Sequence, residues 1–180
     1  PYDDDFSHLA DAPRDSTYEK LKYIPLGGSA YLTLGGEARI RTETREHLNF
    51  GRGTEDDGFD LQHRLRLSAD LNISPNLRIF GELQATGTNG DDVPTRNAVD
   101  HNVIEGHQLF VEATTGFGTD GTLFVRGGRQ EISLGKGRLF DPRNGPNTRR
   151  SYDALRVQAT QGDWRFGAIG GKTVSDLAGD

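Results

Sequence analysis

The feature that most constrains the fold is the alternation of apolar and polar side chains from residue 59 to residue 73. Side chains of a β-strand point alternately to its two faces, so this run has one apolar face and one charged face. The apolar positions are Phe59, Leu61, Leu65, Leu67, Ala69, Leu71 and Ile73, and the polar positions are Asp60, Gln62, Arg64, Arg66, Ser68, Asp70 and Asn72. Globular strands usually contain about five or six residues, whereas about ten tilted residues cross a bilayer. The run therefore predicts a strand in the wall of a barrel, between lipid and water.

The same alternation recurs along the chain and predicts an all-β, antiparallel protein with about seven strands. They are expected at residues 31–47, 59–73, 77–86, 107–115, 122–134, 152–160 and 164–173. The fifth of them is the least regular, and its pair Gly127 and Gly128 predicts a bulge that shifts the register. The pattern therefore leaves open which way Arg126 and Arg129 point.

The composition excludes membrane spanning by helices but not by strands. Hydrophobic residues make up 33% of the chain, the mean hydropathy is −0.67, and no apolar run reaches the length of about 18 residues that a transmembrane helix needs. Half of each strand of a membrane barrel faces water, which keeps the average hydropathy polar. The chain has no cysteine, so disulfides and thiolate chemistry are excluded.

The expected connections alternate in length. Short turns are expected at 74–76, 117–121 and 161–163, and long polar loops at 49–58, 87–106 and 139–151. Tight periplasmic turns and longer extracellular loops are typical of outer-membrane barrels. Trp164 and Phe166 follow the third short turn and Tyr31 opens the first strand, where an interfacial aromatic girdle is expected.

The charges are unevenly distributed. The formal net charge is −6, but many arginines fall within the alternating segments, and only four of the 21 basic residues are lysine. Arginine grips carboxylates or sulfates through two parallel hydrogen bonds, although arginines inside a barrel also pair with acids on neighbouring strands. The polar faces supply as candidate pore-lining residues Glu37, Arg39, Arg41, Arg64, Arg66, Arg78, Glu82, Glu112 and Arg156.

Four segments in order along the chain resemble motifs of the alginate export family. They are LKYIPL at 21–26, YLTLGGEARIR at 31–41, GGRQEISLGKGRL at 127–139 and GPNTRRSYDALRV at 145–157. The resemblance implies an outer-membrane barrel of about 18 strands that exports a polyuronate through an arginine-lined pore. It also implies pore-lining roles for Arg129 and Gln130, at the GRQ positions, and for Arg39 and Arg41, after the glycine pair.

The expected function is that of a bacterial outer-membrane channel for passive passage or export of a polar or anionic solute, such as a uronate-type polysaccharide or oligosaccharide. Inward acids, namely Glu37, Glu43, Glu82 and Glu112, alternate with the arginines, so the predicted lumen has mixed charge. Seven strands cannot close a bacterial barrel, so residues 30–180 are expected to be the N-terminal strands of a longer barrel. Residues 1–29 are expected to form a periplasmic or lumenal segment.

Other classes of function are less well supported. No serine and histidine form a recognisable catalytic elbow, so we expect no enzyme and no catalytic residue. His63 interrupts an apolar face without ligand partners at metal spacing, which indicates an interface residue; no metal or cofactor is expected. The net negative charge gives no indication of nucleic-acid binding.

The expected partners are outer-membrane lipid and the solute, with a periplasmic protein or a second copy left open. The alternative is a soluble or surface-attached β-domain that binds saccharide.

Overall fold

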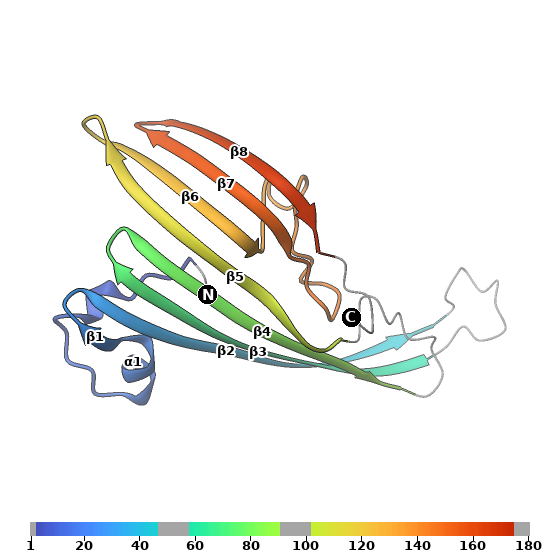
Figure 1. The fold of residues 1–180 in the computed structure, drawn as a ribbon. Helices are drawn as coiled ribbons and strands as arrows, with labels where there is room; N and C mark the ends of the chain where they lie inside the picture. The colour runs from blue at the N-terminus through green and yellow to red at the C-terminus, as the bar shows by residue number, and fades with distance from the viewer. Residues whose placement is uncertain (1–2, 47–57, 91–101, 175–180) are drawn as a thin grey trace.

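A computed structural model describes residues 3–46, 58–90 and 102–174, and these form one antiparallel sheet of eight strands in the order of the sequence (Figure 1). The strands are β1 Ile24–Gly27, β2 Ala30–Arg45, β3 Gly58–Ser74, β4 Leu77–Asn89, β5 Asn102–Phe117, β6 Gly121–Gln130, β7 Tyr152–Gln161 and β8 Trp164–Thr173. A short 3₁₀ helix, η1 Ser7–Leu9, and one α-helix, α1 Thr17–Lys22, precede them. The predicted all-β antiparallel fold is confirmed, with one strand more than expected.

Each strand pairs with the next. β1 and β8 form the two edges of the sheet, and within the described residues no further strand pairs with the outward side of either. The turns that join β3 to β4, β5 to β6 and β7 to β8 lie at one end of the sheet, and the strand ends joined by the longer connections lie at the other (Figure 1). We call these the short-turn end and the long-loop end. Most residues of the loops expected at 49–58 and 87–106 fall outside the described residues. No helix in the described part of the chain is both long enough and apolar enough to cross a membrane.

The two faces of the sheet reverse the usual distribution of a soluble protein. On the face that we call the outer face, large apolar side chains are exposed; Leu67 is 54% exposed and Leu109 is 63% exposed. On the opposite face, the inner face, charged and polar side chains are buried, and Arg66 is only 3% exposed. In the register of β2 and β3, Leu67 pairs with Gly36 and Arg66 pairs with Glu37. Residues that pair directly lie on the same face, so the apolar positions of the two strands share the outer face and the charged positions share the inner face. The alternation read from the sequence is therefore real in three dimensions.

The strand boundaries differ from expectation in several places; β4 extends to Asn89 rather than to residue 86, and β5 begins at Asn102 rather than at residue 107. The alternation does not predict β1, yet this strand pairs with β2, so the sheet starts at Ile24 rather than at residue 31. β6 ends at Gln130 because the backbone N–H of Glu131 donates to the side chain of Gln108 at 2.9 Å and leaves the ladder. The sheet therefore begins earlier, and its sixth strand ends sooner, than the alternation indicates.

The predicted bulge at Gly127 and Gly128 is wrong. Both residues pair in unbroken register with β5 and with β7. Gly128 has a φ of +127°, and a Cβ there would collide with the backbone oxygen of Leu109. The glycine allows two strand backbones to approach closely, which explains its presence without any change of register.

The N-terminal segment packs on the inner face at the short-turn end. Ser16 and Glu19 form a capping box that starts α1. Lys22, at the end of that helix, donates from Nζ to the Leu34 backbone oxygen at 2.9 Å. The ring of Tyr23 stacks on that of Tyr31, with 4.5 Å between centroids. These contacts fix α1 to β2.

The aromatic residues near the short turns divide between the two faces. Trp164 and Phe166 are exposed on the outer face with stacked rings, 5.9 Å between centroids. Tyr31, which the sequence places in the same girdle, is buried beneath the N-terminal segment. Tyr31 pairs with Asn72, and two residues away on each strand Thr33 pairs with Asp70. Because Asp70 is on the inner face, Tyr31 lies on that face too. The expectation for Tyr31 is therefore wrong.

Candidate functional site

The connection between β6 and β7, residues 131–151, folds over the inner face instead of extending from the long-loop end; we call it the inward loop. Asn147 is fully buried, and its side-chain amide donates to the backbone oxygens of His63 on β3 and Gly87 on β4, both at 3.0 Å. Arg39 on β2 donates to the backbone oxygen of Asn144 at 2.9 Å. The loop therefore crosses from its roots on β6 and β7 to the first strands of the sheet.

Glu131 is the centre of the contacts that hold this loop. Its two oxygens accept hydrogen bonds from Arg149, from Nε at 2.5 Å and from Nη2 at 2.6 Å. His107 Nε2 lies 2.9 Å from Oε1, and Arg66 Nη2 donates to the same oxygen at 3.2 Å. Burial opposes ionisation of Glu131, but the hydrogen bonds from His107 and Arg149 and the guanidinium charges outweigh it and lower its pKa to about 2. The carboxylate is thus charged and fully engaged at neutral pH.

The ion pairs continue along the inner face from this centre. Arg66 pairs with Glu82 on β4 at 2.6 Å and with Glu37 on β2 at 3.3 Å. Arg64 pairs with the other oxygen of Glu37 at 2.6 Å. Acids and arginines therefore alternate across three strands, as the sequence predicted, and compensate one another in a buried setting where an unpaired charge would be costly.

One group of side chains in the described part of the chain has metal-ligand composition. Glu82, His107 and Glu131 are buried, with ligand atoms within 4.8 Å of one another. The oxygens of both carboxylates already accept hydrogen bonds from Arg66, and Arg149 binds Glu131 through two more. A divalent cation would have to displace two guanidinium groups, so this donor set fits an ion-pair network better than a metal centre.

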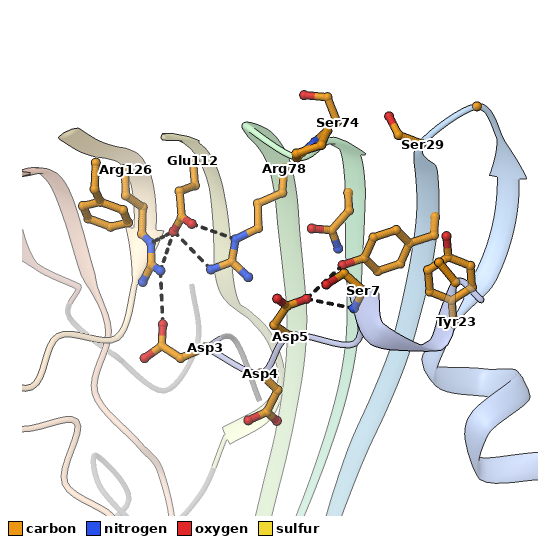
Figure 2. Close-up of a pocket in the computed structure, with 16 residues that line it drawn as sticks. Asp3, Asp4, Asp5, Ser7, Tyr23, Ser29, Ser74, Arg78, Glu112 and Arg126 are labelled. Atoms are coloured by element: carbon orange, nitrogen blue, oxygen red, sulfur yellow. Dashed lines mark hydrogen bonds and ion pairs between the residues drawn. The ribbon is translucent and has the colours of Figure 1, made fainter. Parts of the chain in front are cut away.

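A second charged cluster lies at the short-turn end of the inner face (Figure 2). Glu112 on β5 bridges two arginines, accepting from Arg78 Nε at 2.9 Å and from Arg126 Nε at 2.7 Å. Arg78 also pairs with Asp70 at 3.0 Å, and the Arg126 guanidinium lies 4.3 Å from the ring centroid of Phe110. These arginines line a pocket of about 700 Å³ between the sheet and the N-terminal segment.

The structure brings nearly all predicted pore-lining residues to the inner face. These are Glu37, Arg39, Arg41, Arg64, Arg66, Arg78, Glu82, Glu112, Gln130 and Arg156. Gln130 does not face open space, because it is fully buried and its amide donates to the backbone oxygens of Gly128 and Ala154. Its contacts are those of a structural residue at the end of β6.

Arg129 is the exception. It pairs in register with Leu109, which places it on the outer face, and its Nε donates to Asp153 at 3.0 Å. Arg129 lies on the outer face because the register is unbroken through Gly127 and Gly128; only a bulge at these glycines would have turned its side chain inward. The pore-lining role expected for Arg129 is therefore wrong. His63 also lies on the outer face, with its ring against Gly87.

Sequence reasoning missed three residues that organise the site. Glu131 directly follows the GRQ motif, but the alternation assigns it to a strand that in fact ends before it. The sequence assigns no role to His107, and the pattern leaves the direction of Arg126 open. Counting inward positions from Glu112, with the register unbroken, would have placed Arg126 beside Glu112. Alternation from Phe110 instead predicts that Gln108 faces inward and His107 outward, and only the register shift between β4 and β5 at Glu82 and Leu83 allows His107 to reach Glu131.

The sorting of side chains defines the class of protein. A sheet whose outer face exposes large apolar residues while its inner face buries arginines and acids is the wall of a transmembrane β-barrel. The gathering of the short turns at one end of the strands matches the same class.

The chain belongs to the alginate export family, whose model, described as alginate export, matches residues 30–173. This is a family of outer-membrane proteins associated with polysaccharide export. The comparisons with curated proteins and with solved structures found no match.

Proposed function

We propose that this chain forms part of the wall of an outer-membrane channel through which a polar or anionic saccharide, of the uronate class, passes by diffusion. The observation that carries the proposal is the reversed sorting of the two faces: exposed leucines such as Leu67 suit lipid, and buried ions such as Arg66 suit a polar lumen. The family is a transport family, and we propose no enzymatic activity.

A pocket of about 430 Å³ on the inner face supports a saccharide as the solute. It lies between the inward loop and the strands β7 and β8. Leu134, Phe140 and Ile169 give it apolar walls, and Arg156 and Arg165 add two guanidinium groups. An apolar surface suits the carbon face of a sugar ring, and guanidinium groups bind carboxylates through two hydrogen bonds.

The unpaired edges support a larger assembly. In lipid, each unsatisfied backbone group costs several kcal/mol, so an open strand edge is not tolerated within the hydrocarbon region. Within the described residues, no further strand pairs with the outward side of β1 or of β8. We propose that further strands complete the barrel.

The alternative, a saccharide-binding domain outside the membrane, needs a cover for the outer face. A β-sandwich packs two apolar faces together. Among the described residues nothing covers the outer face of the eight-stranded sheet, and Leu67 and Leu109 remain about half exposed or more. The channel therefore accounts for the apolar residues and the sandwich does not.

The direct test is electrical. The full-length protein, extracted in detergent and reconstituted in planar bilayers, should give discrete conductance steps, and trigalacturonate should reduce the current more than uncharged maltotriose at equal concentration. Conductance that both sugars reduce equally would overturn the anionic substrate class. A protein that stays soluble without detergent and produces no conductance would overturn the channel itself.

A further inference from the structure

The first residues of the described chain reach across the inner face to the arginine cluster at the short-turn end. We call Asp3, Asp4 and Asp5 the acidic arm; all three line the pocket of about 700 Å³ together with Arg78 and Arg126 (Figure 2). α1 is fixed to β2, whereas Asp3 pairs with Arg126 on β6. The arm therefore spans the strands between β2 and β6.

The two ends of the arm are held differently. Asp5 is anchored near the wall: its Oδ1 accepts from the backbone N–H of Ser7 at 2.8 Å and from the Tyr31 hydroxyl at 3.5 Å. The Ser7 hydrogen bond lowers the pKa of Asp5, so this carboxylate is charged. At the other end Asp3 pairs with Arg126 Nη2 at 3.3 Å, and its side chain is 77% exposed.

The arginine side of this contact is built into the wall. The side chain of Arg126 is 2% exposed, and Glu112 and the ring of Phe110 fix its position. The cluster holds Arg78 and Arg126 around a shared acid, Glu112. A second carboxylate that arrives from the pocket meets a preorganised guanidinium, and in this structure the carboxylate of Asp3 takes that position.

We propose that Arg126 and Arg78 form a carboxylate-binding site at the short-turn end, and that the acidic arm is an internal competitor which an anionic solute displaces. This inference rests on the proposed function, because it assigns regulation to the same lumen. A run of aspartates resembles a polyuronate in presenting one carboxylate per unit. The exposed Asp3 is the part of the arm that exchanges, while α1 and Asp5 keep it close to the site.

Binding of trigalacturonate to the full-length protein in detergent, measured by titration calorimetry, tests the competition. Asp3→Asn preserves the size of the side chain and removes its charge, so the dissociation constant should fall about two- to fivefold, the range expected for loss of an exposed ion pair. Removal of residues 1–4 should give at least the same gain. Asp11→Asn is the matched control, since Asp11 lies in the same segment and does not line the pocket; its dissociation constant should equal that of the unchanged protein.

The outcomes separate this inference from the channel itself. Equal affinity of the Asp3→Asn variant, the truncated variant and the unchanged protein would overturn the competition, even where the protein conducts ions. A gain that Asp11→Asn shows equally would also overturn it, because it would reflect only the overall charge. Tighter binding in the two arm variants alone would support the site, and the bilayer measurement decides separately whether the protein is a channel.

Discussion

Arg149 binds Glu131 through two hydrogen bonds, Nε to Oε1 at 2.5 Å and Nη2 to Oε2 at 2.6 Å. This pair, which we call the clip, joins the end of the inward loop to its first residue. Because His107 and Arg66 contact the same carboxylate, the clip also ties the loop to β5 and β3. The loop is thus held in place on the inner face of the sheet.

Removal of this carboxylate should destabilise the protein. Glu131→Ala leaves Arg149 and Arg66 without their shared acid, and loss of one partner of a buried ion pair costs about 3–5 kcal/mol. Urea unfolding of the reconstituted protein measures the loss. The control is Asp163→Asn, because Asp163 is exposed in the turn between β7 and β8, outside the strands, and its substitution should cost about 0.5 kcal/mol or less. Equal losses in the two variants would contradict a structural role for the clip.

The pH dependence of the clip follows from the lowered pKa of Glu131, about 2 against an ordinary value of 4.5. A depressed pKa stabilises the folded state fully above the unfolded value, and this contribution is lost as pH falls towards the folded value. The stability difference between the unchanged protein and Glu131→Gln should therefore be constant from pH 7 to about pH 5 and shrink between about pH 4.5 and pH 2. A difference that shrinks already between pH 7 and pH 6 would show that His107, rather than Glu131, controls the clip.

The sequence was sufficient to predict which residues lie on each face of the sheet, and insufficient to predict the loop that covers part of the inner face. Alternation is a property of consecutive residues, so the inner positions of Arg64, Arg66 and Glu82 could be read directly. The inward loop depends on contacts between distant residues, such as Asn147 with the backbones of β3 and β4, and no local pattern encodes them. For that reason the sequence predicts a loop that extends outward and gives no sign of the role of Glu131.

The error at Arg129 has a more specific cause. A glycine pair in a strand is compatible with a bulge or with close approach of a neighbouring backbone, and the two alternatives point the next side chain in opposite directions. The pairings of Gly127 with Val111 and Gly128 with Phe110 settle this in favour of close approach. A resemblance to a motif could not supply that register.

The close approach at Gly128 can be tested by adding one methyl group. Its φ of +127° is unfavourable for alanine, and the new Cβ would collide with the Leu109 backbone oxygen, so Gly128→Ala should lower stability by about 1–3 kcal/mol or prevent assembly. Gly170→Ala on β8 is the control, because no atom lies within 4 Å of the position that its Cβ would take, and it should behave as the unchanged protein. Heat-modifiable migration in gels measures the assembly and the thermal stability of both variants. Normal assembly and stability of Gly128→Ala would show that the close approach of the two backbones does not require glycine at this position.

The assignment of the outer face to lipid makes the strongest demand on a single residue. Leu67 lies near the middle of β3, is 54% exposed and has no covering element within the described residues. An arginine at the bilayer midplane costs about 2–4 kcal/mol on the lipid face of a barrel, so Leu67→Arg should sharply reduce folding into lipid vesicles, measured by heat-modifiable migration. Leu139→Arg introduces the same charge on the inward loop, where Leu139 is 77% exposed outside any strand, and should fold normally. If both variants fold equally well, Leu67 does not face lipid, and the apolar face must be covered by protein instead.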